Sequence, residues 1–219
     1  MTYILMAGGP IQQVPLVDKI IKEYPDAHWI GVDRGVFILL KHGIEPEHAF
    51  GDFDSLTKEE RDWIDKTGIK LNVFPCEKDE TDMEIALKWT LKQHPSQVIL
   101  FGGTGGRLDH LFMNAQLILQ GLQQKIPVYI QDRWNKLTIW NPGTYTIETS
   151  NYPYVSLIPH SSEVKGLMLE GFRYPLVNAS IKQGSSQCVS NEIIANQGTI
   201  TFSEGRLYVF QTMDEITDK

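Results

Sequence analysis

Cysteine is scarce in this chain of 219 residues, which contains two, Cys76 and Cys188. They lie far apart and belong to no CxxC pair or Cys/His cluster, so neither a structural zinc site nor a disulfide framework is expected. We expect both to be small, buried or half-buried side chains of a protein kept in a reducing compartment. A cytoplasmic location is therefore predicted.

Long apolar stretches are also missing. No run approaches the roughly 18 apolar residues that a membrane-spanning helix requires. The N-terminus has no basic segment and its apolar run stops at Gly8-Gly9, which is typical of a strand rather than a signal peptide. With 18 glycines and 11 prolines, the chain also lacks the composition of a low-complexity sequence. We expect a folded protein outside the membrane.

Basic residues are in the minority, with 20 Lys and Arg against 27 Asp and Glu and a net charge of −7. This balance argues against nucleic acid or an anionic membrane as the main partner. The acids are unevenly placed, because residues 1–120 hold 18 of the 27. The first half is thus the place to look for a bound cation.

Several well-known site motifs are absent. The sequence has no Walker A motif, no G-x-G-x-x-G, no Gly-x-Ser-x-Gly elbow and no HExxH. Asp109-His110 is not accompanied by a positioned Ser or Cys nucleophile, so a catalytic triad is not indicated. The common nucleotide-binding, hydrolase and zinc-protease signatures are therefore excluded.

The first part of the chain alternates short apolar runs with helical periodicity. Strands are predicted at 2–7, 27–32, 49–50, 69–74 and 97–101, with helices between and after them at 14–24, 35–42, from 57, from 81 and at 108–122. Thr57 with Glu60 and Thr81 with Glu84 have the spacing of helix capping boxes. This alternation predicts an α/β domain with a mostly parallel sheet.

The rhythm changes after Pro127, where short apolar runs are separated by turn residues and no helix-length pattern is convincing. Such spacing predicts an antiparallel β-sandwich or barrel. The boundary falls between about 124 and 135. We set the domains at residues 1–128 and 129–219.

Acidic residues follow the predicted strands of the first domain. Asp33 ends the second strand, Asp52 and Asp54 follow the third, and Asp79 and Asp82 flank the start of a helix. Ligands of open α/β sheets bind outside the carboxyl ends of the strands, where these residues are expected to meet. Clustered carboxylates repel one another unless a cation lies among them, and oxygen ligands without Cys or His favour Mg²⁺. The plainer alternative is helix caps and solvated loop acids.

A glycine-rich segment, Gly102-Gly103-Thr104-Gly105-Gly106, links a strand to a helix and is followed by Arg107. Its backbone N–H groups at a helix start, together with the Arg107 guanidinium, suit phosphate oxygens. A turn kept only for packing is the alternative explanation.

The segments GDFDS (51–55), KDETDME (78–84) and GGRLDHLFMN (105–114), in this order and spacing, resemble thiamine pyrophosphokinases of the bacterial type. In the second half, Gly171–Leu176 is similar to the family's GLKYPL stretch, and 184–192 to its glycine–serine stretch ending in SNE. The resemblance covers nearly the whole chain.

The resemblance implies a Mg²⁺-dependent transferase that moves a diphosphate group from ATP to the hydroxyl of thiamine, giving thiamine diphosphate and AMP. It implies a Rossmann-like three-layer α/β catalytic domain followed by a thiamine-binding β-sandwich. It also implies a homodimer with shared active sites, and the net charge of −7 adds the expectation of no nucleic-acid or membrane partner. The remaining alternatives are a metal-dependent nucleotidyl- or glycosyltransferase and a catalytically silent thiamine- or nucleotide-binding sensor.

The resemblance also implies roles for individual residues. The catalytic residues are expected to be Asp54, Asp82 and Asp109, and the metal ligands Asp52, Asp54, Asp79 and Asp82. The residues expected to bind ATP and its phosphates are Asp33, Lys78, Gly103, Thr104, Gly105, Arg107 and Asn114. Those expected to bind thiamine are Tyr174, Ser190 and Asn191. The choice of general base between Asp82 and Asp109 stays open.

Overall fold

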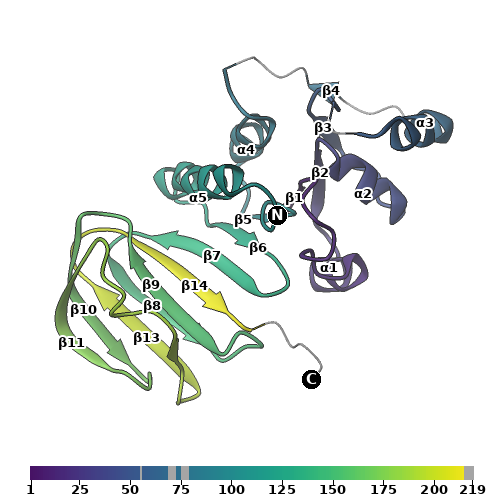
Figure 1. Ribbon diagram of the computed structural model, residues 1–219. Helices are drawn as coiled ribbons and strands as arrows, with labels where there is room; N and C mark the ends of the chain where they lie inside the picture. Colours follow the sequence, from purple (N-terminus) through teal and green to yellow (C-terminus); the bar gives the residue numbers. More distant parts are fainter. Residues whose placement is uncertain (55, 69–72, 75–78, 215–219) are drawn as a thin grey trace. The chain divides into compact units, whose positions relative to one another are not determined.

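In the computed structural model, residues 1–54, 56–68, 73–74 and 79–214 are described, and the chain divides into two compact units, Met1–Arg133 and Trp134–Lys219 (Figure 1). This division lies a few residues beyond the boundary that we set at 128. Strand β6 (Val128–Gln131) pairs in parallel with β5 (Gln97–Phe101), and the backbone N–H of Arg133 donates to the carbonyl of Gln13. The first unit therefore includes β6 and the residues directly after it.

A parallel sheet with strand order β6-β5-β1-β2-β3-β4 forms the centre of the first unit. Its other strands are β1 (Thr2–Met6), β2 (His28–Val32), β3 (His48–Phe50) and β4 (Val73–Phe74). The helices between them are α1 (Val17–Glu23), α2 (Gly35–Lys41), α3 (Lys58–Thr67), α4 (Asp82–Leu91) and α5 (Leu108–Gln123). Figure 1 shows α4 and α5 on one side of β1–β3 and α1–α3 on the other. The predicted alternation of strands and helices around a parallel sheet is confirmed.

Buried apolar residues along β1 explain why this strand lies at the centre of the sheet. Alternate residues of β1 lie opposite alternate residues of β5: Ile4 is paired with Ile99, and Met6 with Phe101. All four are at most 1% exposed and share one apolar cluster with Ile20 and Leu39 from the covering helices. Burying a side chain of this size contributes about 1.5–3 kcal/mol. The strand ends, and the loops that follow them, are held in place by this layer.

The two predicted capping boxes differ in the structure. At α3 both halves form, because Thr57 Oγ1 accepts from the backbone of Glu60 and the Glu60 carboxylate accepts from that of Thr57. At α4 the Thr81 hydroxyl accepts from the backbone of Glu84, but the Glu84 carboxylate contacts Lys88 at 2.9 Å and Gln120 of α5 at 3.1 Å. The Glu84 carboxylate therefore contacts Lys88 of its own helix and Gln120 of a neighbouring helix, and the second half of the capping box does not form.

Antiparallel strands make up the second unit, and no helix occurs between residues 134 and 214. One set has the order β12-β9-β14-β7 and the other β11-β10-β13-β8. Their bounds are β7 (Asn135–Trp140), β8 (Gly143–Glu148), β9 (Tyr154–Pro159), β10 (Glu163–Glu170), β11 (Leu176–Lys182), β12 (Asn191–Glu192), β13 (Gln197–Phe202) and β14 (Leu207–Thr212). Both sets contribute to one apolar cluster, with Leu157 and Val209 from the first and Leu167 and Ile200 from the second. Antiparallel strands in this half were predicted.

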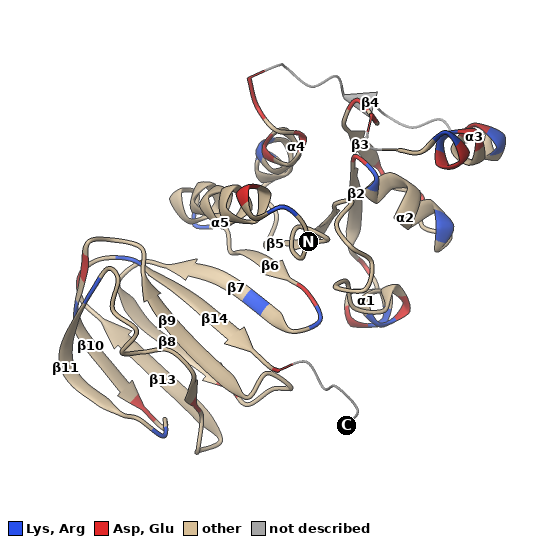
Figure 2. Ribbon diagram, in the orientation of Figure 1, with Lys and Arg blue, Asp and Glu red and all other residues tan. Residues whose placement is uncertain are grey.

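The positions of the charged residues and of Cys188 agree with what the sequence predicts. Figure 2 shows Asp and Glu gathered in the helices and loops of the first unit, whereas the strands of the second are mostly uncharged. Cys188 is a buried free thiol whose pKa is raised by burial, as expected of a packing residue, and Cys76 lies outside the described residues. Among the described helices, none has the length and apolar character to span a bilayer.

Candidate active site

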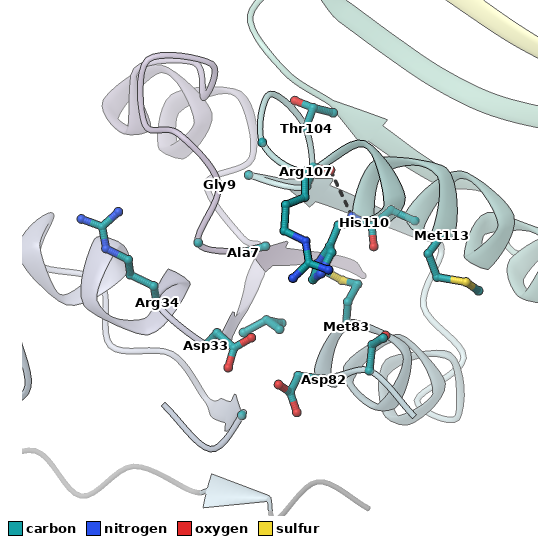
Figure 3. A pocket seen from close by; sticks show the side chains of 18 of the residues that line it. Ala7, Gly9, Asp33, Arg34, Asp82, Met83, Thr104, Arg107, His110 and Met113 are labelled. Carbon is teal, nitrogen blue, oxygen red and sulfur yellow. Dashed lines mark hydrogen bonds between the residues drawn. The ribbon is translucent and has the colours of Figure 1, made fainter. Parts of the chain in front are cut away.

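The loops at the carboxyl ends of β1, β2, β3 and β5 and the first turns of α4 and α5 line one cavity of about 1430 Å³ (Figure 3). This is the edge of the sheet where the sequence placed the candidate residues. The chain leads from β1 to α1 and from β5 to α5, and Figure 1 shows these two helices on opposite faces of the sheet. Loops that diverge in this way from neighbouring strands leave a crevice between them. The topology of the sheet therefore determines where the cavity lies.

The loop after β1 and the glycine-rich loop after β5 contact each other where they line the cavity. The N–H of Gly9 donates to the carbonyl of Gly102 at 2.9 Å, and a Cβ at Gly9 would lie 2.3 Å from that oxygen. Gly102 has φ +69°, and a Cβ there would lie 2.3 Å from the carbonyl of Ala7. Both positions thus require glycine. The sequence pattern assigns Gly8-Gly9 no role beyond ending the strand, although a glycine pair at the end of a central strand is an available signal for a site.

Three carboxylates meet on the opposite side of the cavity. Oxygens of Asp33, Asp52 and Asp82 lie within 4.8 Å of one another. Figure 3 shows the carboxylates of Asp33 and Asp82 turned toward the same space. The approach depends on unusual backbone angles: Asp33 has φ +50°, and a Cβ at Gly51 (φ +141°) would lie 2.4 Å from Asp33 Oδ1. These three acids are called the carboxylate cluster below.

The carboxylate cluster is electrostatically costly without a cation. Burial raises the pKa of Asp33 to about 7, together with the negative charge of Asp82, a side-chain hydrogen bond with Asp82, and the charges of Asp52 and Asp54. Asp33 Oδ1 is buried and has no hydrogen-bond partner among the described residues. An unpartnered buried oxygen beside two further carboxylates is a donor set that suits a hard divalent cation such as Mg²⁺.

The structure groups the acids differently from the predicted metal set. Asp52 and Asp82 are brought together as expected, but the third member of the cluster is Asp33, which we had assigned to the nucleotide. Asp54 is exposed and outside the cluster, although its charge helps to raise the pKa of Asp33 and its N–H donates to Asp52 Oδ1 at 3.0 Å. Asp79 is exposed and lines neither the cluster nor the cavity. Lys78 lies outside the described residues.

The start of α5 carries an ion pair at the rim of the cavity. Arg107 donates from Nε to Asp109 Oδ1 at 3.1 Å and from Nη2 to Asp109 Oδ2 at 2.5 Å. This pairing lowers the pKa of Asp109 to about 2. Asp109 is therefore a weak base in this arrangement, and Arg107 is a donor that anionic oxygens of a ligand can compete for.

The glycine loop (residues 102–106) is held by two side chains. Asn114 of α5, which is buried, donates from Nδ2 to the carbonyl of Gly103 at 3.0 Å. The Thr104 hydroxyl donates to Asp132 Oδ2 at 2.7 Å. Gly103 and Thr104 line the cavity, and Asn114 reaches it from the helix. No sequence motif singles out Asp132, although it too directly follows a strand of the parallel sheet.

The acid-bearing loop after β3 is fixed by α3. Arg34, which lines the cavity, donates to Glu60 Oε1 from Nε at 2.9 Å and from Nη2 at 2.7 Å. Arg61 Nη2 donates at 2.7 Å to the carbonyl of Phe53, the residue between Asp52 and Asp54. The first contact joins the turn after β2, next to Asp33, to α3, and the second joins the loop after β3 to the same helix, whose start is itself capped.

The three residues assigned to thiamine lie in the second unit and are linked there. The Asn191 amide accepts from the N–H of Tyr174 at 3.0 Å and donates to its carbonyl at 2.9 Å. Asn191 is 5% exposed, whereas Tyr174 is 63% exposed. Ser190 has φ +57°, and its N–H donates to Ser156 Oγ. The buried amide thus holds the backbone of an exposed aromatic residue.

Comparison with known proteins identifies both units. The family model described as thiamin pyrophosphokinase, catalytic domain, matches residues 22–130, and that for the vitamin B1 binding domain matches residues 144–207. The thiamine pyrophosphokinase of Bacillus subtilis (strain 168) is 43% identical over 216 residues, which cover 97% of this chain and 99% of that protein. The chain belongs to the thiamine pyrophosphokinase family.

Solved structures of family members have the same fold. The thiamine pyrophosphokinase of Bacillus subtilis has a TM-score of 0.93 at 41% identity, covering 98% of this chain and 100% of that chain. The enzyme of Geobacillus thermodenitrificans has a TM-score of 0.91 at 45% identity, covering 99% of both chains. The thiamin pyrophosphokinase of Candida albicans shares the fold at 14% identity, with a TM-score of 0.79 over 97% of this chain and 89% of that one.

The matched ranges of the thiamine pyrophosphokinase family contain most of the candidate residues. The carboxylate cluster, Arg107 and Asn114 fall within the catalytic-domain match, and Tyr174, Ser190 and Asn191 within the vitamin B1 binding match. Gly9 and Asp132 lie outside both. The structure shows that both residues contact the glycine loop, although neither lies in a range that the family models match.

Proposed function

We propose that this enzyme transfers a diphosphate group from ATP to the hydroxyl of thiamine, giving thiamine diphosphate and AMP. The observation that carries the proposal is the convergence of the carboxylate cluster and the glycine loop on one cavity, in a member of the thiamine pyrophosphokinase family. Transfer of this kind needs little covalent chemistry from the protein. It needs in-line positioning and neutralisation of the charge on phosphate oxygens.

Mg²⁺ is the proposed metal, held by Asp33, Asp52 and Asp82, with Asp54 close by. The buried, unpartnered oxygen of Asp33 and the raised pKa of that carboxyl support the assignment, because both are relieved by a cation. When bound, Mg²⁺ neutralises negative charge on the oxygens of the transferred group. Asp79 is not proposed as a ligand, because its exposed position lies away from the cluster.

The phosphates of ATP are proposed to bind at the glycine loop and the start of α5. Backbone N–H groups of residues 103–105 and the N-terminus of a helix that runs from Leu108 to Gln123 provide donors. Arg107 adds its guanidinium once phosphate oxygens replace Asp109 as its partner. These groups hold the nucleotide so that the bond to be broken lies toward the carboxylate cluster.

The proton of the thiamine hydroxyl must pass to a base. Asp82 and Asp109 are both candidates, since both line the cavity. In the structure the pairing with Arg107 lowers the pKa of Asp109 to about 2, and phosphate oxygens that replace Asp109 as the partner of Arg107 would restore its basicity. The proposal therefore keeps both carboxylates as proton acceptors.

Thiamine is proposed to bind through the second unit. The exposed ring of Tyr174 suits the face of a cationic, aromatic ligand. Ser190 provides a hydroxyl nearby in sequence, and Asn191 acts by holding the Tyr174 backbone. The resemblance to the family further supports a homodimer with shared active sites.

The finer fold assignment and the cellular context are proposals too. Helices on both sides of the parallel sheet support a Rossmann-like three-layer domain, and two antiparallel sets around one apolar cluster support a β-sandwich. The net charge of −7 supports the absence of nucleic-acid and membrane partners, and the scarcity of cysteine supports a cytoplasmic location.

The test of the proposed function is the identity of the nucleotide product. With ATP, thiamine and Mg²⁺, we expect AMP to appear in equal amount to thiamine diphosphate, measured by ion-exchange chromatography. A panel of other nucleoside triphosphates establishes the preferred donor. Release of ADP in place of AMP, or nucleotide turnover that is independent of thiamine, would contradict the proposal.

Replacing the exposed aromatic residue tests the thiamine side. Tyr174→Ala is expected to raise the KM for thiamine on the order of ten-fold and to lower kcat less, because a stacking contact of about 1–2 kcal/mol is lost from bound substrate and transition state alike. Steady-state AMP release at varied thiamine measures both constants. Tyr174→Phe keeps the ring and is the matched variant. An unchanged KM in Tyr174→Ala would contradict stacking.

A further inference from the structure

The glycine loop has an unusual composition for a segment that must be held in one conformation. Four of its five residues are glycine, and Thr104 is the one residue with a side chain. Gly102 and Gly105 have φ of +69° and +77°. Because glycine loses more conformational entropy on ordering than other residues, such a loop needs external anchors to present its N–H groups in a fixed arrangement.

The one side chain of the loop is bonded to Asp132. This aspartate directly follows β6, is 3% exposed and does not line the cavity, whereas Thr104 does. The Thr104 hydroxyl carries a single hydrogen, and it is donated to Asp132 Oδ2 at 2.7 Å. That hydroxyl therefore does not donate to a ligand, and Thr104 contributes to phosphate binding through its backbone.

The segment after β6 also supports the loop from a second direction. The N–H of Arg133, next to Asp132, donates to the carbonyl of Gln13 at 2.7 Å. Gln13 in turn packs on the loop, because a Cβ at Gly105 would lie 2.5 Å from Gln13 Cγ. On the other side, Asn114 holds the carbonyl of Gly103. The loop is thus fixed at three successive residues.

We infer that Asp132 is a positioning residue for the nucleotide: through the Thr104 hydroxyl it holds the glycine loop in the conformation that presents backbone N–H groups to the phosphates. The inference rests on the proposed function, since it concerns the same nucleotide site. It adds a residue outside both matched family ranges, with a role in affinity for the triphosphate rather than for thiamine. Pre-organisation of this kind lowers the entropy that the loop loses on binding.

The test compares variants that keep or remove this hydrogen bond, using α,β-methylene-ATP with Mg²⁺ as the probe and isothermal titration calorimetry of the full chain. Thr104→Val keeps the shape and removes the hydroxyl, and we expect its Kd to rise on the order of ten-fold, as for loss of a hydrogen bond to a charged group. Thr104→Ser restores the hydroxyl and is expected to recover most of the lost affinity. Amide hydrogen exchange of residues 102–107 without ligand should be faster in Thr104→Val than in the wild type.

Removing the acceptor tests Asp132 itself. Asp132→Ala is expected to weaken binding at least as much as Thr104→Val, and the double variant no more than Asp132→Ala alone, because the Thr104 hydroxyl acts through its bond to Asp132. If Asp132→Ala does not fold, the comparison of Thr104→Val with Thr104→Ser still tests whether the hydrogen bond to Asp132 holds the loop. Thr90→Val is the matched control, since the buried Thr90 hydroxyl bonds to the Ala86 carbonyl away from the cavity; its Kd should equal that of the wild type.

The outcomes separate this inference from the proposed function. Wild-type affinity and exchange in Thr104→Val, or equal damage by Thr104→Ser and Thr104→Val, would overturn the role of Asp132 while leaving AMP release intact. A wild-type chain that releases no AMP would overturn the proposed function, and loop exchange would still report on the anchor. A KM for thiamine that rises as much as the Kd for the nucleotide would indicate a general structural defect and also contradict the inference.

Discussion

Asp82→Asn is expected to lower kcat for AMP release by about 100-fold or more, because a contact that neutralises developing charge is worth roughly 3 kcal/mol. Asp82 opens α4 and brings its carboxylate to the cluster with Asp33 and Asp52. Asparagine keeps the size of the side chain and removes its charge. Steady-state rates at saturating ATP, thiamine and Mg²⁺ measure the effect, and circular dichroism checks that the variant is folded.

A graded series makes this first prediction specific. Asp52→Asn should resemble Asp82→Asn, and Asp54→Asn should have a smaller effect, because Asp54 lies outside the cluster. Asp65→Asn, on the exposed surface of α3, is the matched control and should keep the wild-type rate. Equal and mild effects at Asp82 and Asp65 would contradict the metal assignment.

Asp33→Asn is expected to raise thermal stability at pH 8 without divalent cations and to abolish most of the stabilisation by Mg²⁺. The pKa of Asp33 is raised to about 7, above the 3.8 of the unfolded chain. The folded state therefore binds the proton more tightly, and the stability linked to this group is fully present below about pH 4 and lost as the pH rises through 7. Allowing for solvent near the partly exposed carboxyl, the loss is about 2 kcal/mol.

Melting temperatures from pH 5 to pH 8 in EDTA measure this difference. The wild type should lose stability relative to Asp33→Asn over this window, and 5–10 mM Mg²⁺ should restore it in the wild type more than in the variant. Asparagine accepts the left-handed backbone of position 33 (φ +50°), so the comparison is not confounded by strain. Parallel pH curves for the two proteins would rule out a destabilising carboxylate at this position, and Asp65→Asn should follow the wild type.

Local patterns in the sequence were enough to predict the elements. The apolar run of β1 and the helical spacing of α5 depend on side-chain periodicity, which is a local property. The Thr57–Glu60 capping box formed as predicted because both partners belong to one helix start. The Thr81–Glu84 box formed only in part: the Glu84 carboxylate contacts Lys88 of the same helix and Gln120 of α5, and no local pattern contains the second contact.

The site was predictable to the level of the sheet edge and not to the level of its ligand set. Parallel strands end at one edge, so acids and glycines that follow them had to gather there. Which acids meet depends on the backbone angles at Asp33 and Gly51, which no sequence pattern specifies. Asp33 joins the cluster from the end of β2, whereas Asp79, which precedes α4, lies outside it.

By itself the sequence determined a parallel α/β part, an antiparallel β part, the edge of the sheet that carries the chemistry, and the family. Periodicity, strand-end positions and short motifs are written along the chain, so they need no three-dimensional information. Only the tertiary structure showed three contacts. Asp33 belongs to the carboxylate cluster, Arg107 forms an ion pair with Asp109, and Asp132 accepts a hydrogen bond from the Thr104 hydroxyl. Those contacts join residues through the positions of loops and strand ends, which depend on how the whole sheet and its helices pack.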